Sequence, residues 1–427
     1  MPLESRLPSS ASRLLRLSLC LIGAVLVLAA DRAGTTPALV ERHLEAMGTL
    51  LGLSVAGPDR AAALESSEKA VREIARVETL ITTWRPGGPL DRVNTAPPGE
   101  AVLMDAEVSE LLNTVFGWSE RTEGAFDPTV LPLVRAWDLR GRGCVPDVAT
   151  LSRALAATGR DRFALDAATG RTRRLSSDAG IDEGAWGKGY ALDRAVSELK
   201  RCGVREALLD LGGQVSAIGP ARVAIADPRE RRRTAAFLDI LDSSVSTSGN
   251  SERGIVVAGR RIGHLLDPRT GRPAPDFGSA TVVAPSGFTA DILSTAFFVL
   301  GPEKGLDLSE RLRRQGFPNE ALFLVASDGG WKTIASPGLR SRLECPGLQA
   351  REQSPLVIPS PSLPFCHPER SEGSAPVALS RLVRSGQAPQ RICPGHDLSN
   401  RPEQILRRFA PQNDKKGSAA PLRLSKR

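Results

Sequence analysis

Short apolar stretches, interpreted as strands, come mostly in adjacent pairs between longer segments of helical periodicity. They cover residues 206–211, 223–226, 235–241, 261–265, 279–283 and 321–326, with a further strand at about 50–56, and Gly, Pro and Asp turns separate them. Strands joined by a turn pair antiparallel, whereas parallel strands need a crossover of about a dozen residues or more. We therefore expect an α+β fold with largely antiparallel sheets rather than a doubly wound sheet.

Helical periodicity marks the segments between the strand pairs. Within residues 61–82, Ala70, Ile74, Val77 and Ile81 recur at intervals of three or four, with charged residues between them. Further helices are expected at 107–121, 148–158, 190–201, 289–299 and 305–314. The middle of the chain, of roughly 300 residues, can form one large domain or two smaller ones.

Residues 1–33 have the pattern of a signal peptide. Arg13 and Arg16 precede an apolar run from Leu17 to Ala30, and small and polar residues follow it. The run is shorter than the ~20 residues that span a bilayer comfortably. We expect an exported protein, periplasmic or held in the inner membrane facing the periplasm, with an uncleaved N-terminal membrane anchor as the alternative.

The last part of the chain, residues 341–427, has a different composition. Pro, Ser, Arg and Gln alternate with brief apolar islands, without a period of 2 or 3.6, which is typical of a disordered tail. Residues 367–373 and 405–414 also resemble the translation of an intergenic inverted repeat, so the tail is interpreted as possible read-through. The functional domain is expected at residues 34–340.

The net charge of +8 does not indicate a nucleic-acid partner. Residues 34–340 carry 38 basic and 39 acidic side chains, so the basic excess lies in the two ends of the chain. A nucleic-acid-binding domain needs a clustered basic face, and single-stranded substrates need aromatic platforms, whereas aromatic residues make up only 4% of this chain. We expect no nucleic acid among its partners.

Several common chemistries are excluded in the middle segment. It contains two histidines, His43 and His264, which rules out a His-rich metal site, and it has no G-x-S-x-G elbow. Gly184-Ala-Trp-Gly-Lys-Gly189 lacks the glycine spacing of a Walker A loop and the hydroxyl residue that should follow its lysine.

Clusters of Gly, Asp, Ser and Thr remain as the candidate chemistry. Glycine turns that precede a helix present backbone N–H groups to anions, and neighbouring carboxylates attract Mg²⁺. A nucleotide or dinucleotide with magnesium is one interpretation; turns that hold no ligand are the other, because they have the same composition. The clusters cover residues 124–129, 182–193, 210–214, 246–250, 264–273 and 289–295.

Eight motifs occur together in the order and spacing of one known family. They are Met47-Gly-Thr49, Trp84 ahead of Val93-Asn94, Gly124-Ala-Phe-Asp-Pro-Thr129 with Trp137, Asp182-x-Gly184-x-x-x-Lys188-Gly-Tyr-Ala191-x-Asp193, Leu209-Asp-Leu-Gly-Gly213, Thr247-Ser-Gly249, His264-Leu-Leu-Asp-Pro-Arg-Thr-Gly271 and Ala290-Asp291-x-x-Ser294-Thr295. From about residue 44 to residue 335 the chain therefore resembles the FAD:protein FMN transferase (ApbE) family.

This resemblance implies an α+β fold of two closely packed subdomains and an exported, Mg²⁺-dependent enzyme. Its substrate would be FAD, and it would place FMN on a Thr or Ser hydroxyl of a partner such as a membrane redox subunit or an exported reductase, releasing AMP. By position, the FAD contacts are Met47, Trp84, Ala125, Phe126, Asp127, Asp182, Lys188 and Leu266. The magnesium ligands are Ala185, through its carbonyl, with Asp291, Ser294 and Thr295, and the catalytic residues are His264 and Asp291.

The residue types fit these roles, but some of these residues could instead have a purely structural role. Asp291, Ser294 and Thr295 lie at i, i+3 and i+4, so on a helix they share one face. Asp291 could instead stabilise a helix N-terminus, and His264 could be a buried structural histidine. Lys188 could form an exposed pair with Asp193.

The sequence also departs from the family at Glu183 and Trp186, where small or aliphatic residues are usual, and at Asn250, where an acidic residue is common. The alternative functions are FAD binding without transfer and FAD hydrolysis to FMN and AMP.

Overall fold

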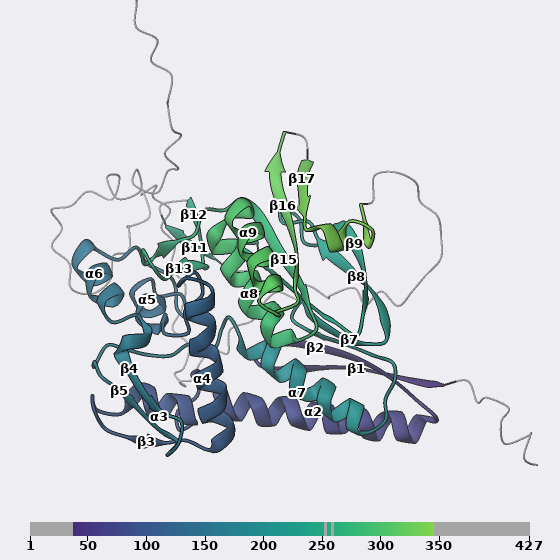
Figure 1. Ribbon diagram of the computed structural model, residues 1–427, viewed down its shortest axis with the longest axis horizontal. Coiled ribbons are helices and arrows are strands. Elements are labelled where there is room, and N and C mark those ends of the chain that lie inside the picture. The colour runs from purple at the N-terminus through teal and green to yellow at the C-terminus, as the bar shows by residue number, and fades with distance from the viewer. Residues whose placement is uncertain (1–36, 252–253, 258–259, 329, 346–427) are drawn as a thin grey trace, which may run out of the picture.

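The computed structural model describes residues 37–251, 254–257, 260–328 and 330–345 (Figure 1). The predicted signal peptide lies outside these residues, as does the predicted tail from residue 346. Within the described ranges, no helix has both the length and the apolar character needed to cross a membrane.

An eight-stranded sheet organises the larger part of the molecule. Its strand order is β1-β2-β6-β7-β10-β15-β16-β17, and every recorded pair is antiparallel. This confirms the expected α+β class. The strands are β1 (Ala38–Ala46), β2 (Thr49–Gly57), β6 (Ala207–Leu211), β7 (Gln214–Ile218), β10 (Ser244–Gly249), β15 (Gly278–Ala284), β16 (Glu320–Ser327) and β17 (Gly330–Ala335).

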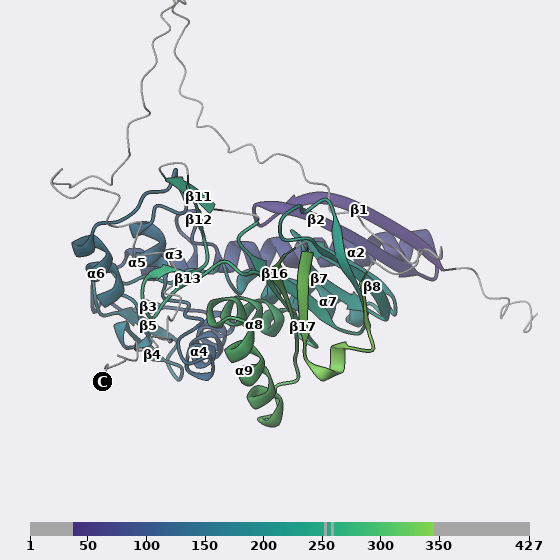
Figure 2. The ribbon, with the colours of Figure 1, turned by 90° about the horizontal axis from the view of Figure 1, so that it is seen from above.

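Both faces of this sheet are covered. The helices α2 (Arg60–Ile81), α7 (Gly187–Arg201), α8 (Gly287–Leu300) and α9 (Pro302–Arg314) lie on one face, and Figure 2 shows α2 running alongside β1 and β2. The strands β8 (Pro220–Ala226), β9 (Thr234–Leu241) and β18 (Leu343–Glu344) form a second sheet whose apolar side chains pack against the other face. On β15, Val282 faces the helices and Val283 faces the second sheet. The strand is therefore buried along its whole length.

A smaller subdomain lies beside the sheet and shares its main core (Figure 1). Phe116 and Phe163 belong to the same buried cluster as Leu53 and Leu209 of the sheet. The elements of this part are α3 (Pro89–Thr95), α4 (Ala106–Arg121), α5 (Leu131–Ala136), α6 (Val148–Ala156), η1 (Arg160–Arg162), β3 (Val102–Leu103), β4 (Phe163–Asp166) and β5 (Arg171–Arg174). The hairpins β11–β12 (Gly254–Val257, Arg260–Gly263) and β13–β14 (Leu266–Asp267, Arg272–Pro273) follow β10, and η2 (Pro337–Leu339) precedes β18.

The sequence pattern missed mainly strands whose residues are polar. β10 reads Ser-Val-Ser-Thr-Ser-Gly, and β1 reads Ala-Leu-Val-Glu-Arg-His-Leu-Glu-Ala, with its polar residues grouped near its centre. β10 is a strand because β7 and β15 pair with it on both sides, which overrides its composition. β18 lies within the predicted tail, so regular secondary structure is described slightly past residue 340.

A charged network joins three helices at the outer side of this architecture. Arg76 of α2 contacts both carboxylate oxygens of Glu107 on α4 at 2.8 Å, and the Tyr190 hydroxyl of α7 donates to the same carboxylate at 2.7 Å. The Arg76 guanidinium, aided by Tyr190, lowers the pKa of Glu107 from its usual 4.5 to about 2. The ionised form of Glu107 thus stabilises the contact between the helices.

We predict a pH-dependent effect of Glu107→Gln. The pKa is lower in the folded chain, so the stabilisation is complete above about pH 4.5 and is lost as the pH falls towards 2. At pH 7 the variant should lose about 1 kcal/mol of unfolding free energy, a value discounted because solvent screens the pair. Urea denaturation at several pH values measures this.

The matched control is Glu110→Gln, an exposed carboxylate on the same helix for which no ion pair is recorded among the described residues. It should change little at any pH. A Glu107→Gln loss that persists undiminished at the lowest pH would contradict the assignment.

Candidate functional site

The N-terminal turns of α7 and α8 touch each other through glycines. A Cβ added at Gly189 would lie 2.2 Å from the carbonyl oxygen of Gly287, and a Cβ at Gly287 would lie 2.9 Å from the carbonyl oxygen of Gly189. Both distances are shorter than side chains tolerate. Glycine at these two positions therefore lets the helix backbones meet, which brings Lys188 and Asp291 into one region.

Each helix supplies a carboxylate to the other helix's N-terminus. Asp193 of α7 accepts hydrogen bonds from the backbone N–H groups of Gly287 (2.5 Å) and Phe288 (3.1 Å), and from the Ser286 hydroxyl (2.6 Å). Asp291 of α8 accepts from the N–H of Gly189 (3.1 Å). The first-turn N–H groups of a helix have no partner within it, so this reciprocal capping satisfies them. The alternative of an exposed Lys188–Asp193 pair is wrong, because Asp193 faces α8.

Asp291 is nearly inaccessible, with 5% of its surface exposed. Burial raises the pKa of its carboxyl, while the Lys188 ammonium, the Gly189 N–H and the Ser246 hydroxyl oppose that rise. Burial likewise raises the pKa of Asp210 at the end of β6, again opposed by Gly213 N–H and Lys188. The Lys188 charge thus acts on both Asp210 and Asp291, and a bound cation would favour the ionised form of Asp291 further.

Oxygen donors surround Asp291. Ala185 lies just before the N-cap residue of α7, Trp186, and no hydrogen bond to its carbonyl is recorded among the described residues. Thr295 lies one turn after Asp291, and its Oγ1 is 3.4 Å from the Ser248 hydroxyl. A carboxylate, hydroxyls and a carbonyl are ligands that suit Mg²⁺.

Ser294 occupies a more crowded position. Its Oγ lies 3.0 Å from the Asp291 carbonyl, 3.1 Å from Ser246 Oγ and 2.9 Å from Ser248 Oγ, and its side chain is fully buried. It would have to give up one of these contacts to reach a cation. Among the described residues there is no group of three or more His, Cys, Asp or Glu side chains that could hold a metal, so any cation depends on this mixed donor set.

A second cluster holds Trp84 and Asp182 together. The Arg140 guanidinium donates to Asp182 Oδ2 (2.5 Å), to the Thr83 carbonyl (3.0 Å) and to Thr83 Oγ1 (2.7 Å). Its Cζ lies 4.3 Å from the centre of the Trp84 ring, a cation–π contact. The Trp84 side chain remains 58% exposed. The indole is therefore fixed in place but presents much of its surface to solvent.

Glu183, one of the departures from the family pattern, belongs to this cluster. Its carboxylate accepts from the Thr83 N–H (3.0 Å) and the Thr83 hydroxyl (2.5 Å), and it lies 3.8 Å from Arg140. Burial, together with the neighbouring Asp182 charge, raises the pKa of Glu183 to about 6. Trp186, the other departure at this loop, is fully buried and donates from Nε1 to the Asp182 carbonyl at 2.9 Å. Both unusual residues thus fix the loop that carries Asp182.

The residues 125–127 lie next to this loop, but their side chains point inwards. Ala125 and Phe126 are buried in the main core. The Asp127 carboxylate accepts from the N–H (2.8 Å) and hydroxyl (2.6 Å) of Thr129. The Pro128 carbonyl accepts from the Asp182 N–H at 2.8 Å, which joins the two segments. A ligand here would meet backbone groups rather than the side chains of Ala125 and Phe126.

The turn between β1 and β2 is linked to the Trp84 segment through one glutamate. Met47 and Gly48 both have positive φ, as a two-residue hairpin turn requires. The Met47 N–H donates to Glu78 Oε2 (3.0 Å), and Glu78 Oε1 accepts from Arg85 (2.9 Å), which follows Trp84. Glu78 thus joins the turn at Met47 to Arg85, the neighbour of Trp84 in the sequence.

His264 lies on the segment that joins β12 to β13, and Leu266 is the first residue of β13. Leu266 is buried against Leu133 and Trp137, and the Trp137 Nε1 donates to the Gly271 carbonyl at 2.8 Å. His264 directly follows β12 and is partly buried. Arg269 lies against Gly124 and forms an ion pair with Asp267 at 2.8 Å, so this segment also borders residues 124–127.

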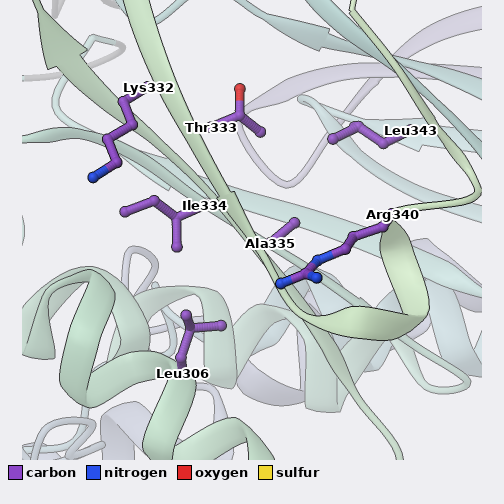
Figure 3. Close-up of a pocket in the computed structure, with 7 residues that line it drawn as sticks. All are labelled: Leu306, Lys332, Thr333, Ile334, Ala335, Arg340 and Leu343. Atoms are coloured by element: carbon purple, nitrogen blue, oxygen red, sulfur yellow. The ribbon is translucent and has the colours of Figure 1, made fainter.

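The described cavities lie away from these residues. Figure 3 shows a cavity of about 540 Å³ beside the edge strand β17, lined by Leu306, Lys332, Thr333, Ile334, Ala335, Arg340 and Leu343. None of the predicted site residues contributes to it. The candidate site is therefore defined by the two helix N-termini and the loops beside them.

Sequence reasoning missed the residues that support the site from a distance. Thr83 and Arg140 contact residues 42 to 100 positions away in the sequence, so no local pattern marks them. Ser246 and Ser248 did carry a signal, since alternating hydroxyl residues on a strand share one face.

Comparisons with known proteins agree on one family. A family model described as the ApbE family matches residues 47–317. An FAD:protein FMN transferase of Klebsiella pneumoniae is 30% identical over 342 residues, covering 76% of this chain and 96% of that protein. Another of Salmonella typhimurium is 30% identical over 344 residues, covering 76% and 97%.

Solved structures show the same relationship. The ApbE protein from Thermotoga maritima superposes with a TM-score of 0.64 at 29% identity, covering 70% of this chain and 98% of that one. The apo form of the Pseudomonas stutzeri flavinyl transferase ApbE gives a TM-score of 0.61 at 29% identity, covering 71% and 96%.

We predict that Gly189→Ala separates the two helices. Its Cβ would overlap the Gly287 carbonyl, and the backbone cannot yield locally, so unfolding free energy should fall by about 1–3 kcal/mol. Guanidinium denaturation measures the loss. Gly330→Ala is the control, because no heavy atom lies within 4 Å of the added Cβ; equal losses in both variants would contradict the close contact.

Proposed function

The chain belongs to the ApbE family and is a flavin transferase, and on this basis we propose that it moves FMN from FAD to a Thr or Ser hydroxyl of an acceptor protein, with Mg²⁺ bound and AMP released. The observation that carries the proposal is the environment of Asp291. A buried carboxylate and nearby hydroxyls lie where the N-termini of α7 and α8 converge, and the Ala185 carbonyl lies just before the N-cap of α7. Such a place suits a phosphate and its cation.

The metal site would use Asp291, the Ala185 carbonyl, Thr295 and Ser294. When bound, Mg²⁺ would neutralise charge on the phosphate oxygens during transfer. The protein contributes the fixed positions of the donors, because the Gly189 N–H and the Ser246 hydroxyl orient the Asp291 carboxylate. Lys188, beside the same carboxylate, supplies a positive charge for the pyrophosphate.

FAD would be held by the loops beside the helices. Trp84 presents an exposed indole and Met47 a partly buried side chain, and Glu78 accepts hydrogen bonds from Met47 and from Arg85, the residue after Trp84. Asp182, Leu266 and the backbone of residues 125–127 complete the predicted contacts. Flat aromatic rings such as those of FAD stack well on an indole.

The reaction exchanges one phosphorus–oxygen bond for another. The acceptor hydroxyl oxygen attacks the FMN phosphorus, and the bond from that phosphorus to the bridging oxygen breaks. AMP leaves with the bridging oxygen, and the hydroxyl proton passes to a base. His264, with Asp291 near the metal, would take this proton, a step that typically contributes about 10²–10⁴-fold in rate.

The acceptor would be an exported or membrane redox protein. This part of the proposal rests on the export pattern of residues 1–33 and on the family resemblance. Near-neutral charge across residues 34–340 fits a protein acceptor better than a polyanion.

The test uses the full-length protein with FAD, Mg²⁺ and an acceptor domain that carries a candidate Thr. We expect flavin fluorescence on the acceptor that survives denaturation, with one AMP released per flavin attached. Asp291→Asn should reduce both products by at least about 10²-fold, because the carboxylate that would hold the cation is lost. Asp307→Asn, an exposed carboxylate on α9, is the matched control and should keep full activity.

Other outcomes separate the alternatives. AMP and free FMN without labelled acceptor would indicate hydrolysis, and tight FAD binding without either product would indicate a binding protein. Unchanged activity of Asp291→Asn would refute the metal assignment.

A further inference from the structure

We propose that Arg140 is an FAD-positioning residue that acts through Trp84 and Asp182. This inference rests on the proposed function, because it needs Trp84 and Asp182 to contact FAD. Neither the sequence motifs nor the family resemblance assigns a role to Arg140. The role proposed for Arg140 rests on the contacts that its guanidinium makes.

Arg140 joins two separate parts of the proposed FAD site. One guanidinium nitrogen, Nη2, donates to both Thr83 Oγ1 and Asp182 Oδ2, while Nη1 donates to the Thr83 carbonyl. Thr83 directly precedes Trp84. Arg140 therefore bridges the segment after α2 and the loop before α7, in addition to the direct hydrogen bonds between Thr83 and Glu183.

Arg140 also contacts the Trp84 indole directly. Arg140 Cζ lies 4.3 Å from the Trp84 ring centre, so the guanidinium covers one face of the ring. The side chain is nevertheless 58% exposed, which leaves surface for a second aromatic ring to stack on. An exposed tryptophan without such support would sample several rotamers and lose entropy when FAD bound. Arg140 fixes the indole before FAD binds, so this entropy is not lost on binding.

The cluster around Arg140 is not arranged for stability alone. Arg140 Nε is buried without a hydrogen-bond partner, which is unfavourable for a donor. Two adjacent carboxylates, those of Asp182 and Glu183, lie beside the same guanidinium at 2.5 Å and 3.8 Å, and like charges this close repel one another. Without Arg140, the Asp182 carboxylate would lose this ion pair, which helps to fix its position.

Lysine cannot replace arginine fully at this position. A guanidinium is planar, so it can stack on the indole while its nitrogens reach Thr83 and Asp182. A lysine ammonium could keep the positive charge and one hydrogen bond, but it could not also keep the other hydrogen bonds and the stacking on the indole. Arg140→Lys should therefore recover part of the function that Arg140→Gln loses.

The experiment measures FAD affinity of the full-length protein by titration calorimetry with EDTA present, so that no turnover occurs. Arg140→Gln should weaken FAD binding about tenfold, as expected for a lost cation–π contact with its ordering effect. With Mg²⁺ restored, kcat at saturating FAD and KM for the acceptor should stay within about twofold of wild type, because the reacting atoms are not touched. Arg142→Gln, an exposed arginine two residues away, should bind FAD normally.

A double-mutant cycle decides whether Arg140 acts through Trp84. If it does, Arg140→Gln should weaken binding much less in a Trp84→Leu background than in wild type. Fully multiplicative losses, or wild-type affinity of Arg140→Gln, would overturn the inference. Thermal melting of each variant is recorded, and if Arg140→Gln does not fold, an Arg140→Lys variant with wild-type FAD affinity refutes the proposal. Failure of the wild-type protein itself to bind FAD would refute the proposed function instead.

Discussion

The close contact between the N-terminal turns of α7 and α8 determines how the site can be built. Two glycines, Gly189 and Gly287, allow the backbones to meet, and two aspartates, Asp193 and Asp291, each accept N–H groups from the opposite helix. Burial disfavours the ionised form of both carboxylates. Backbone N–H groups and the positive ends of two helix dipoles offset that penalty. The junction is therefore a packing contact at which the N-termini of two helices meet, and it is where the proposed function places the phosphate and its cation.

The sheet beneath this junction explains why polar residues can line it. β10 is covered on both sides by neighbouring strands, and its alternation sends Val245 to the second sheet and Ser246 and Ser248 towards α8. The hydroxyls meet those of α8, so a buried strand carries polar groups without leaving them unpaired. The neighbouring strand β15 also carries buried hydroxyls, Ser279 and Thr281, and the Thr281 hydroxyl lies 2.9 Å from that of Thr247. Hydroxyl residues of two adjacent strands are thus buried in this part of the core.

The sequence predicted the architecture better than the details of the site. Paired strands correctly indicated antiparallel sheets, and the helices at 61–82 and 107–121 lie within a residue or two of α2 and α4, because apolar periodicity reflects which side is buried. β10 and β1 were missed, since their neighbours in space and not their own residues make them strands. The motif residues Lys188 and Asp291 do meet at one junction. Thr83, Arg140 and Glu183 could not be grouped in advance, because only the folded chain brings them together.

The reciprocal capping of α7 and α8 also fixes when the site can appear during folding. The hairpin β1–β2 and the pair β16–β17 join residues close in sequence and can form early, since short loops close quickly. The contacts of Asp291 with Gly189, and of Asp193 with Phe288, span roughly a hundred residues and require both helices to be docked on a finished sheet. A partly folded chain therefore holds no carboxylate poised for a cation. The proposed cation site therefore exists only in the completely folded protein, and a nascent or damaged chain would lack it.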